Sequence, residues 1–483
     1  MAGPRPETTG RLQHDSRKIG QGDIFIAIRG LTSDGHHYIE QAVESGASVI
    51  VSEEPASGEE LSYLHLQVVK TRPLLGRIAQ ALQENPADKL TTIAVTGTNG
   101  KTTTATLIWQ ALMQLGESAG LLGTVAKQFG KRREESRLTT ADPVELADDM
   151  RRMVDAGCRY LSMEVSSHAL DQERVEGIHW NLALFTNLSH DHIDYHSSLE
   201  AYIEAKKKLF DSLGKQAIAI VNADDTHSRA MIRDCSARTV EYGFHPGVST
   251  RCKLDQLNEK GTVFQVDSIR IESPLVGRFN AYNVAGAFLA CRELGFEPDE
   301  VAAALKHCNG APGRLESVQL SGDDEKGPAV FVDYAHTPDA LENVASTLSR
   351  LSGADRPLTI LFGCGGDRDR EKRSRMAEIA ERYGDSIVVT SDNPRNEDPA
   401  AIIREIETGF SDHAKWTTRI SREEAILHVI KEAPENSLVL IAGKGHETYQ
   451  EFESGRRIHF DDREVARRAL KARRNVNQAD GGN

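Results

Sequence analysis

Apolar and polar positions alternate along the chain in short blocks, whose spacing predicts both strands and helices. Short apolar runs predict buried strands, and segments in which apolar residues recur every three or four positions predict helices. We predict strands at residues 24–28, 48–51, 92–95, 158–163, 182–185, 217–221, 329–333, 358–362, 386–390 and 438–442, and helices at 38–45, 74–82, 143–156, 199–213 and 277–294.

Polar breaks divide this pattern into three blocks. Glu-Asn-Pro-Ala-Asp-Lys at 84–89 separates a small first block from the second, and Pro-Gly-Arg at 312–314 closes the second. In the second and third blocks strands alternate with helices, which is typical of a doubly wound, mainly parallel sheet. In such a sheet ligands bind beyond the carboxyl ends of the strands.

Residues 96–103 read Thr-Gly-Thr-Asn-Gly-Lys-Thr-Thr and lie between a predicted strand and a helical pattern. The glycines let the backbone turn its N–H groups toward a phosphate, Lys101 reaches the outer phosphates, and Thr102 offers a hydroxyl to Mg²⁺. Val95 stands where a standard phosphate loop has glycine, so this is a variant loop. An ordinary turn between strand and helix is the alternative.

Composition narrows the class of protein. With 483 residues the chain has room for two to four domains, and a formal net charge of −14 argues against a partner with a phosphate backbone. The six cysteines form no Cys-x-x-Cys pair, and no apolar run approaches the roughly 20 residues of a membrane span. We therefore expect a cytoplasmic protein with no nucleic-acid partner and no membrane span, and we expect a monomer.

Polar side chains gather just after two predicted strands of the second block. Glu164 ends one strand, and hydroxyl, imidazole, amide and guanidinium groups follow it in residues 165–174. Residues 186–196 repeat this arrangement after the next strand, and such oxygen and nitrogen ligands point to a divalent metal and a phosphorylated substrate. By contrast, His36 and His37 have no third ligand nearby in the sequence, so we assign them to a loop surface.

Several motifs together resemble one family. They are Thr-Gly-Thr-Asn-Gly-Lys-Thr-Thr at 96–103, Glu-Val-Ser-Ser-His at 164–168, Thr-Asn-Leu-Ser-His-Asp-His at 186–192, Phe-Asn-Ala-Tyr-Asn at 279–283, Pro-Gly-Arg at 312–314 and Asp-Tyr-Ala-His-Thr-Pro-Asp-Ala-Leu at 333–341. They occur in the order seen in the Mur ligases of peptidoglycan synthesis, which the chain resembles over nearly its whole length. The resemblance is greatest to the members that add meso-2,6-diaminopimelate to UDP-N-acetylmuramoyl-L-alanyl-D-glutamate.

The resemblance implies an α/β protein of three domains. These would be a small N-terminal α/β domain for the UDP substrate at 1–89, a central doubly wound P-loop ATPase domain at 90–316, and a C-terminal Rossmann-like α/β domain for the amino acid at 317–483. It implies an amide-forming ligase that uses ATP and Mg²⁺, acts on small molecules through an acyl phosphate, and serves cell-wall synthesis, cell shape and cell division.

The resemblance also assigns residues to the nucleotide and the metal. The ATP set is Gly97, Thr98, Asn99, Gly100, Lys101, Thr102, Thr103, Asn283, Arg314 and Asp333. The metal set is Thr102, Glu164, His192 and Lys206, with Lys206 carbamylated so that it offers anionic oxygens, and Lys101, Glu164, His192 and Lys206 would be catalytic. Without the resemblance, residues 206–208 read as a solvated helix face.

Two substrate sites complete the assignment. The UDP-muramoyl-dipeptide set is Ser16, Leu31, Thr32, Ser33, Thr139, Thr140, Ser166, Gln172 and Arg174. The diaminopimelate set is Arg368, Asp392, Asn393, Pro394, Arg395, Gly443 and Glu447. Arg395 would hold bidentately the distal carboxylate that lysine lacks, and Glu447 would accept the distal ammonium. The alternatives are a relative with another acceptor, such as a lysine-adding ligase or a folylpolyglutamate synthetase, and a P-loop ATPase that is not a ligase.

Overall fold

The computed structural model describes residues 1–30, 33–57, 61–189, 193–320, 327–353 and 355–480. Its chain forms two compact units, Met1–Arg251 with Ala285–Val301, and Cys252–Val284 with Ala302–Asn483. The first unit contains a small and a large sheet, and the second contains a sheet of its own. Among the helices of the described residues, none is long and apolar enough to cross a membrane.

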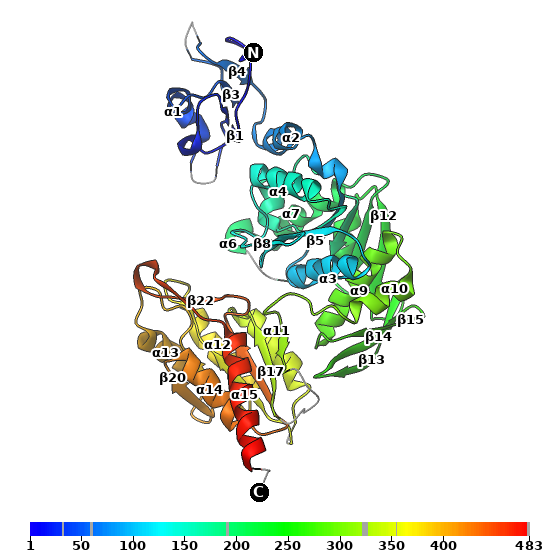
Figure 1. The fold of residues 1–483 in the computed structure, drawn as a ribbon, viewed down its shortest axis with the longest axis vertical. Coiled ribbons are helices and arrows are strands. Elements are labelled where there is room, and N and C mark those ends of the chain that lie inside the picture. The colour runs from blue at the N-terminus through cyan, green and yellow to red at the C-terminus, as the bar shows by residue number, and fades with distance from the viewer. Residues whose placement is uncertain (31–32, 58–60, 190–192, 321–326, 354, 481–483) are drawn as a thin grey trace. The chain divides into compact units, whose positions relative to one another are not determined.

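The small sheet of the first unit has four parallel strands in the order β1-β2-β3-β4. Side chains alternate between its faces, so that Ile24 and Ile26 pack with helix α2 while Phe25 packs with helix α1. Figure 1 shows these two helices on either side of the strands. The bounds are β1 Leu12–Gln13, β2 Ile24–Ile26, α1 Ile39–Glu44, β3 Val49–Ser52, β4 Leu64–Gln67 and α2 Arg72–Leu82.

The large sheet of the first unit runs in the order β12-β11-β10-β5-β9-β6-β7-β8. Its strands are parallel from β12 to β6, and β7 and β8 form an antiparallel extension. Leu161 and Met163 of β9 pack into the core with helices α4 and α7, whereas Ser162 points the other way and donates to the carbonyl of Ala105 in α3 (2.9 Å). Helices therefore cover both faces, as the strand-helix alternation predicts.

The elements of this layer are bounded as follows: β5 Thr91–Thr96, α3 Lys101–Gln114, β6 Ala119–Leu122, β7 Lys127–Phe129, β8 Arg132–Glu134, α4 Pro143–Asp155, β9 Tyr160–Glu164, α5 Ser167–Asp171, β10 Leu182–Phe185, α6 Ile193–His196, α7 Leu199–Asp211, β11 Ile218–Asn222, α8 Ser228–Ile232 and β12 Arg238–Gly243. Strand β13 (Thr250–Asn258) pairs with β12 and leads into β14 (Gly261–Val266) and β15 (Ile269–Ser273), an antiparallel extension. Helices α9 (Arg278–Glu293) and α10 (Pro298–Leu305) follow.

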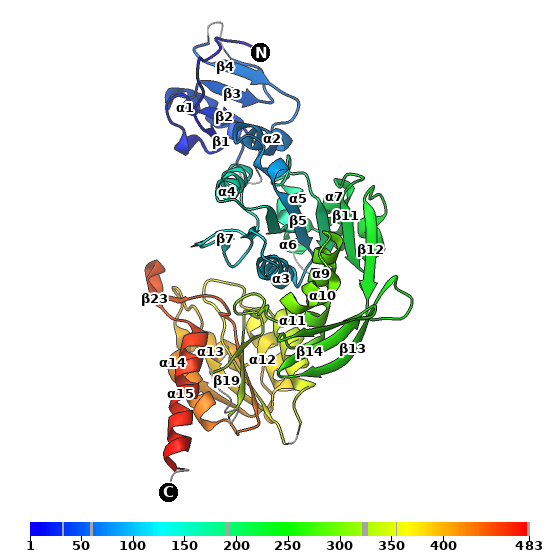
Figure 2. The same ribbon diagram turned by 45° about the vertical axis from the view of Figure 1, so that its right-hand side comes forward.

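The sheet of the second unit has the order β16-β17-β21-β18-β19-β20, and only β16 is antiparallel to its neighbour. Phe331 packs with helices α11, α12 and α13 on one face, and its neighbours Val330 and Val332 pack with α14 and α15 on the other. Figure 2 shows α12 and α14 on opposite sides of β19. Both faces are thus buried, which is why these strands read as continuous apolar runs.

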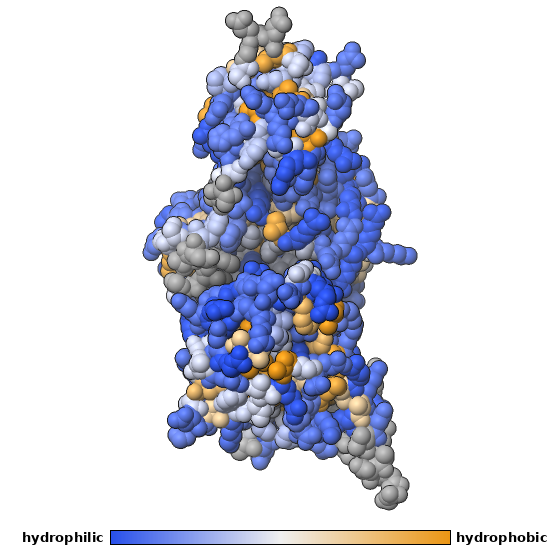
Figure 3. Space-filling model, turned by 90° about the vertical axis from the view of Figure 1, so that its left-hand side faces the viewer, coloured by the Kyte–Doolittle hydropathy of each residue, from blue (hydrophilic) through white to orange (hydrophobic). Residues whose placement is uncertain are grey.

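The bounds in the second unit are β16 Glu316–Val318, β17 Ala329–Asp333, α11 Pro338–Ser349, β18 Leu358–Phe362, α12 Lys372–Tyr383, β19 Ser386–Thr390, α13 Pro399–Glu407, β20 Trp416–Arg419, α14 Arg422–Glu432, β21 Leu438–Ala442, β22 Tyr449–Glu451, β23 Arg457–His459 and α15 Asp462–Asp480. On the face drawn in Figure 3 both units present mainly hydrophilic side chains, and the hydrophobic ones stand in small groups.

Candidate functional site

The predicted phosphate loop connects β5 to α3 and depends on its two glycines. Gly97 (φ +147°) and Gly100 (φ +84°) adopt backbone conformations that other residues rarely adopt. A Cβ atom on Gly97 would lie 1.9 Å from Oγ1 of Thr186, at the end of the neighbouring strand β10. Glycine is therefore required here both by conformation and by space.

Two lysines converge on this loop. Nζ of Lys101 donates to the carbonyls of Gly97 (2.8 Å) and Thr98 (2.7 Å), and Nζ of Lys206 donates to the same carbonyl of Gly97 (2.9 Å). Lys206 is 1% exposed and Lys207 is 4% exposed, so the interpretation of this segment as a solvated helix face is wrong for both. The packing of α7 against the sheet brings Lys206 to the loop from more than 100 residues away in sequence.

The loop is also fastened to the end of β10. The backbone N–H of Thr98 donates to the carbonyl of Asn187 (2.8 Å), and Asn99 exchanges two hydrogen bonds with the side-chain amide of Asn187 (3.0 Å each). Thr103 is buried in the first turn of α3. The loop is therefore held rigidly, with the start of α3 behind it, as anion binding at a helix N-terminus requires.

Glu164 lies at the carboxyl end of β9, beside the phosphate loop. Its carboxylate accepts hydrogen bonds from the hydroxyl of Thr102 (2.8 Å), from the backbone N–H of Thr124 (2.7 Å) and from the hydroxyl of Thr124 (3.2 Å). It is 1% exposed. The lateral order β10-β5-β9 brings these groups together, as predicted from the strand ends. His192 lies outside the described residues. Thr124 was not predicted, because it belongs to none of the motifs.

Thr139 and Thr140, which belong to the predicted dipeptide-binding set, connect Glu164 and Thr124 to Ser166 of the same set. The hydroxyl of Thr140 donates to the backbone carbonyl of Glu164 (2.9 Å) and accepts from the backbone N–H of Ser166 (3.0 Å). The hydroxyls of Thr139 and Thr124 are 3.0 Å apart. Part of the predicted metal and substrate sets, namely Thr102, Glu164, Thr139, Thr140 and Ser166, thus forms one hydrogen-bonded network within the first unit.

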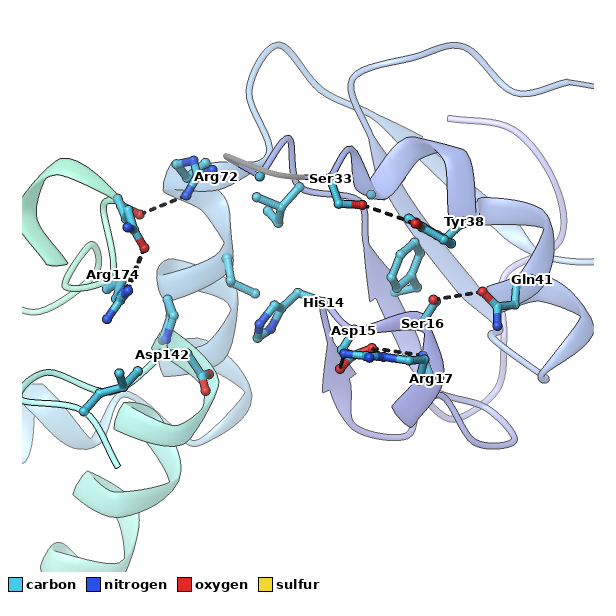
Figure 4. A pocket seen from close by; sticks show the side chains of 18 residues that line it. His14, Asp15, Ser16, Arg17, Ser33, Tyr38, Gln41, Arg72, Asp142 and Arg174 are labelled. Atoms are coloured by element: carbon cyan, nitrogen blue, oxygen red, sulfur yellow. Dashed lines mark hydrogen bonds and ion pairs between the residues drawn. The ribbon is translucent and has the colours of Figure 1, made fainter. Parts of the chain in front are cut away.

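A cavity of about 800 Å³ in the first unit gathers the predicted UDP-substrate residues Ser16, Ser33, Gln172 and Arg174 (Figure 4). Leu31 and Thr32 lie outside the described residues. Ser16 is buried and donates to the side-chain carbonyl of Gln41 (3.1 Å). The other lining residues are His14, Asp15, Arg17, Phe25, Ile28, Gly30, Gly35, Tyr38, Gln41, Arg72, Leu75, Leu138, Asp142 and Pro143.

Arg174 joins this cavity to the threonine network. Its guanidinium donates to the side-chain carbonyl of Gln172 (2.7 and 3.1 Å) and to the backbone carbonyl of Thr140 (2.9 Å). Burial lowers the pKa of Arg174 from its ordinary value. Arg17 and Arg72, which sequence reasoning missed, also line the cavity, which thus has three arginines in its lining. The guanidinium of Arg17 is paired with the carboxylate of Asp15 (2.8 and 2.9 Å). A cavity with this lining suits a long anionic ligand.

The expectation of a surface location for His36 is wrong, because the fold buries this side chain at 6% exposure. Nδ1 lies 2.6 Å from a carboxylate oxygen of Asp34, and Nε2 accepts the backbone N–H of Glu53 (3.0 Å). Asp34, His36 and Glu54 offer three ligand atoms within reach of one metal ion. Both ring nitrogens are already hydrogen-bonded, however, so the histidine serves the loop structure.

In the second unit, Asp333 ends β17 and is buried. Its carboxylate accepts the backbone N–H groups of Leu315 (2.6 Å) and Ala335 (2.7 Å). Burial raises its pKa to about 6, although the nearby Arg314 acts in the opposite direction. The guanidinium of Arg314 lies over the ring of Tyr334, 4.8 Å from the centroid. The predicted nucleotide residues Asp333 and Arg314 are therefore neighbours.

The third predicted nucleotide residue of this unit, Asn283, lies in α9. It is 4% exposed, and its amide donates to the side-chain carbonyl of Asn280 (3.0 Å). The amide of Asn280 in turn donates to the backbone carbonyl of Val276 (2.8 Å). The two asparagines thus form a buried amide chain at the start of the helix.

The predicted diaminopimelate residues 392–395 form a turn after β19. The carboxylate of Asp392 accepts the backbone N–H of Asn393 (2.6 Å). Arg395 has φ +51° and donates to the carbonyl of Gly366 (2.8 Å), and its Nε lies 3.7 Å from the carboxylate of Glu451. The guanidinium of Arg395 is thus directed by contacts on either side of the turn.

Glu447 is held by two neighbours. One of its oxygens, Oε2, accepts from Nδ2 of Asn393 (2.9 Å) and from Nζ of Lys444 (2.9 Å), and Lys444 also donates to the side-chain carbonyl of Asn393 (3.0 Å). Among the described residues, no hydrogen bond reaches the other oxygen, Oε1, and the side chain is 18% exposed. Sequence reasoning overlooked Lys444, although it lies in the same Gly-Lys-Gly-His-Glu motif.

The remaining two residues of this set differ in their roles. Arg368 is exposed, on the loop that follows β18. Gly443 has φ +120°, and a Cβ atom there would lie 2.6 Å from the carboxylate of Asp392. Gly443 therefore allows the end of β21 to approach the turn closely.

Comparison with known families finds three matches along the chain. The Mur ligase family catalytic domain matches residues 10–83, the Mur ligase middle domain matches 95–291, and the glutamate ligase domain of Mur ligases matches 313–445. These matches occur in the order of the three predicted blocks.

Similar proteins extend over almost the whole chain. A UDP-N-acetylmuramoyl-L-alanyl-D-glutamate–2,6-diaminopimelate ligase of Geobacillus kaustophilus is 42% identical, over 96% of this chain and 95% of its own. The enzyme of that name from Cytophaga hutchinsonii is 41% identical, over 94% and 93%. A solved structure of a ligase of that name aligns with a TM-score of 0.71 at 34% identity, over 96% of this chain and 95% of its own.

Proposed function

Since the chain belongs to the Mur ligase family, we propose that it joins meso-2,6-diaminopimelate to UDP-N-acetylmuramoyl-L-alanyl-D-glutamate in a reaction that consumes ATP. The product is an amide, and the step extends the peptide of a peptidoglycan precursor. The family resemblance predicted from the motifs is confirmed. We further propose that the protein is a cytoplasmic monomer with domain boundaries near residues 89 and 316.

The observation that carries this assignment is the turn at residues 392–395. Arg395 offers a guanidinium fork to a carboxylate, and Glu447 offers a carboxylate oxygen to an ammonium. Asn393 connects the two regions by its hydrogen bond to Glu447. An amino acid with both a distal ammonium and a distal carboxylate matches this pair of groups, whereas lysine has only the ammonium.

The chemistry proceeds in two steps. An oxygen of the substrate carboxylate attacks the γ-phosphorus of ATP, the bond to the bridging oxygen breaks, and ADP leaves. The amine then attacks the acyl carbon, loses a proton and expels inorganic phosphate. Activation is required because a carboxylate is a poor electrophile. Lys101 and the backbone N–H groups at the start of α3 stabilise the negative charge on the phosphates during the first step.

The residues beside the loop fit Mg²⁺. Thr102 and Glu164 offer oxygen ligands 2.8 Å apart, and oxygen is the ligand that Mg²⁺ prefers. When bound, the ion neutralises charge on the phosphate oxygens. Thr124 holds Glu164 from behind through its backbone N–H, which fixes the direction of the carboxylate.

We propose that Lys206 is carbamylated in the active enzyme. As an ammonium, Lys206 shares one carbonyl oxygen with the ammonium of Lys101 in a buried region, and two like charges so close repel each other. Carbamylation forms a bond between the amine nitrogen of Lys206 and the carbon of CO₂ and releases two protons, so an anionic carbamate replaces the second positive charge. The carbamate would offer oxygen ligands to Mg²⁺, and Lys101 would remain as the cation of the loop.

The cavity lined by Ser16 and Arg174 is assigned to the UDP-muramoyl portion. Arg17, Arg72 and Arg174 provide cations for the diphosphate and carboxylates of that substrate. The network from Arg174 through Thr140 to Glu164 then leads from this cavity to the metal residues. Asn283, Arg314 and Asp333 are assigned to the nucleotide.

The test is a single-turnover assay with radiolabelled amino acid. We expect tripeptide formation with meso-diaminopimelate and UDP-muramoyl-dipeptide, and little formation with lysine. Equal use of lysine would favour a ligase with another acceptor. ATP turnover in the absence of any amino acid, at the rate seen in its presence, would indicate an ATPase that is not a ligase.

A further inference from the structure

Two segments of the second unit are joined side by side into what we term the acceptor double loop, formed by residues 365–368 and 393–397. The N–H of Gly366 donates to the carbonyl of Asn393 (2.9 Å), and Arg395 returns a hydrogen bond to the carbonyl of Gly366 (2.8 Å). The amide of Asn396 donates to the carboxylate of Asp367 (2.7 Å). The double loop carries both arginines of the predicted diaminopimelate set, Arg368 on one segment and Arg395 on the other.

Glu397 fastens the two segments through its carboxylate. Oε1 accepts the backbone N–H of Asp367 (2.6 Å) and Nη2 of Arg373 (2.9 Å), while Oε2 accepts Nη1 of Arg373 (3.0 Å) and Nη2 of Arg370 (3.0 Å). The side chain is 14% exposed. One carboxylate therefore ties the second segment to the backbone of the first and to α12.

Arg373 anchors the carboxylate of Glu397 to α12. Its side chain is fully buried, and it also donates to the carbonyl of Gly365 (3.3 Å) and to Glu405 (2.6 Å). The hydrogen bond from Arg373 is the main reason that the pKa of Glu397 is lowered to about 2. Glu397 is therefore ionised throughout the working range of pH, and the tie is a charge-assisted one.

The double loop needs such a tie because its backbone is strained. Asp367 (φ +52°) and Arg395 (φ +51°), one on each segment, both adopt the left-handed conformation that residues other than glycine seldom adopt. Such conformations persist only where surrounding contacts enforce them. A Cβ atom on Gly366 would lie 1.9 Å from the carbonyl oxygen of Pro394. The backbones of the two segments therefore approach so closely that there is no room for a side chain at Gly366.

We propose that Glu397 is a positioning residue that sets selectivity for an amino acid with a second carboxylate. It does so by holding together the two segments that present Arg368 and Arg395. This inference rests on the proposed function. If the tie is lost, the left-handed residues relax and the guanidinium of Arg395 leaves the geometry needed for bidentate binding. On the ammonium-binding side of the site, Glu447 keeps its hydrogen bond from Lys444, which lies outside the double loop.

The variant Glu397→Gln in the full-length chain tests this, with Glu405→Gln as the matched control. Both variants remove one carboxylate partner of Arg373, but Glu405 lies on α13 and makes no hydrogen bond to the double loop among the described residues. We expect Glu397→Gln to lower kcat/KM for meso-diaminopimelate by about 10- to 100-fold, through KM. The slow reaction with lysine and KM for ATP should change less than about twofold. Glu405→Gln should keep the ratio of kcat/KM values between diaminopimelate and lysine.

The inference would be overturned if Glu397→Gln had the same ratio of kcat/KM values between diaminopimelate and lysine as the unsubstituted enzyme. It would also be overturned if this ratio fell equally in Glu397→Gln and Glu405→Gln. If Glu397→Gln does not fold, Asn396→Ala replaces it, because this exposed side chain ties the same two segments and bears no buried charge. In Asn396→Ala the ratio of kcat/KM for diaminopimelate to kcat/KM for lysine should fall by about 3- to 10-fold. An unchanged ratio would again overturn the inference. Failure of the proposed function is distinguishable, because the unsubstituted enzyme would then show no preference for diaminopimelate over lysine.

Discussion

In the proposed function the phosphate loop and the acceptor double loop both present cations to an anionic group, yet the two loops are built by different means. In the phosphate loop, Lys101 and Lys206 rest on main-chain carbonyls, and the positive backbone angles belong to glycines. In the double loop Arg395 lies beside the carboxylate of Glu451, the carboxylate of Glu397 ties the two segments together, and the positive angles belong to Asp367 and Arg395.

This difference separates a general function from a selective one. A loop made of backbone groups and glycine fits phosphate, which every ATP-dependent enzyme must bind. A loop held by side chains from several elements is specified by each of those side chains, so one substitution can change which amino acid fits. We therefore expect substitutions near the first loop to affect all substrates, and substitutions near the second to affect one.

The largest effect is expected for Lys206→Ala. Loss of the proposed carbamate would lower kcat by about 1,000-fold with every substrate, since it removes a charged group that serves the phosphoryl transfer. A short carboxylic acid added to the assay should restore part of the activity by supplying the missing anion. Initial rates with and without the acid are the measurement, and a variant that is active without rescue would exclude the carbamate.

Arg395→Ala should affect a single substrate. Loss of the guanidinium fork is expected to raise KM for meso-diaminopimelate by about 100-fold, because the distal carboxylate loses its charged partner. KM for ATP should stay within about twofold. Steady-state kinetics with each substrate varied in turn would show this. Comparable losses for ATP and the amino acid would refute the separation of the two loops.

A smaller effect is expected for Lys444→Met. The substitution leaves Glu447 with one donor, Asn393, so its carboxylate is less well oriented toward the substrate ammonium. KM for diaminopimelate and for lysine should both rise about tenfold. The matched control is Lys431→Met, which removes an exposed lysine whose ion pair, within the described part of the chain, is with Glu432. A larger effect on kcat than on KM would contradict this role.

The smallest effect is a shift of a few degrees in the unfolding midpoint. The pKa of Asp333 is raised to about 6 from an ordinary 3.8 by burial, so the folded chain binds this proton more tightly than the unfolded chain does. Its protonation therefore adds stability as the pH falls from about 6 to about 4, and adds none above about 6. As the pH falls through this range, the unfolding midpoint of the wild type should rise relative to that of Asp333→Asn, whose side chain is uncharged at every pH, so the two should differ most at the upper end. A constant difference would argue against the raised pKa.

Much of the fold could be predicted because buried parallel strands are continuous apolar runs. The predictions at 182–185, 329–333, 358–362, 386–390 and 438–442 agree with β10, β17, β18, β19 and β21 at both ends. The antiparallel strands β13 to β15 were missed. One face of β13 is largely exposed, so its sequence, Thr-Arg-Cys-Lys-Leu-Asp-Gln-Leu-Asn, lacks an apolar run.

The candidate site divides in the same way. Lys101, Thr102 and Glu164 could be found because a motif places them next to a strand end. Thr124, Arg373 and Glu397 could not, since their roles arise only when elements distant in sequence come together. Glu397 contacts Arg373, 24 residues away, and Thr124 contacts Glu164, 40 residues away. Neither contact produces a hydrophobic periodicity or a short motif in the sequence, so neither could be predicted from it.

The hydrogen bonds of Lys101 to the carbonyls of Gly97 and Thr98 have a consequence for the speed of nucleotide capture. An ammonium in water must shed its hydration shell before it can grip a phosphate, whereas this one has already exchanged water for two carbonyl oxygens. Arrival of the nucleotide then becomes an exchange of one oxygen ligand for another, with little solvent to reorganise. The carbonyl oxygens of Gly97 and Thr98 thus take the place of phosphate oxygens until the nucleotide binds, and they keep the ammonium of Lys101 near the position of the phosphates.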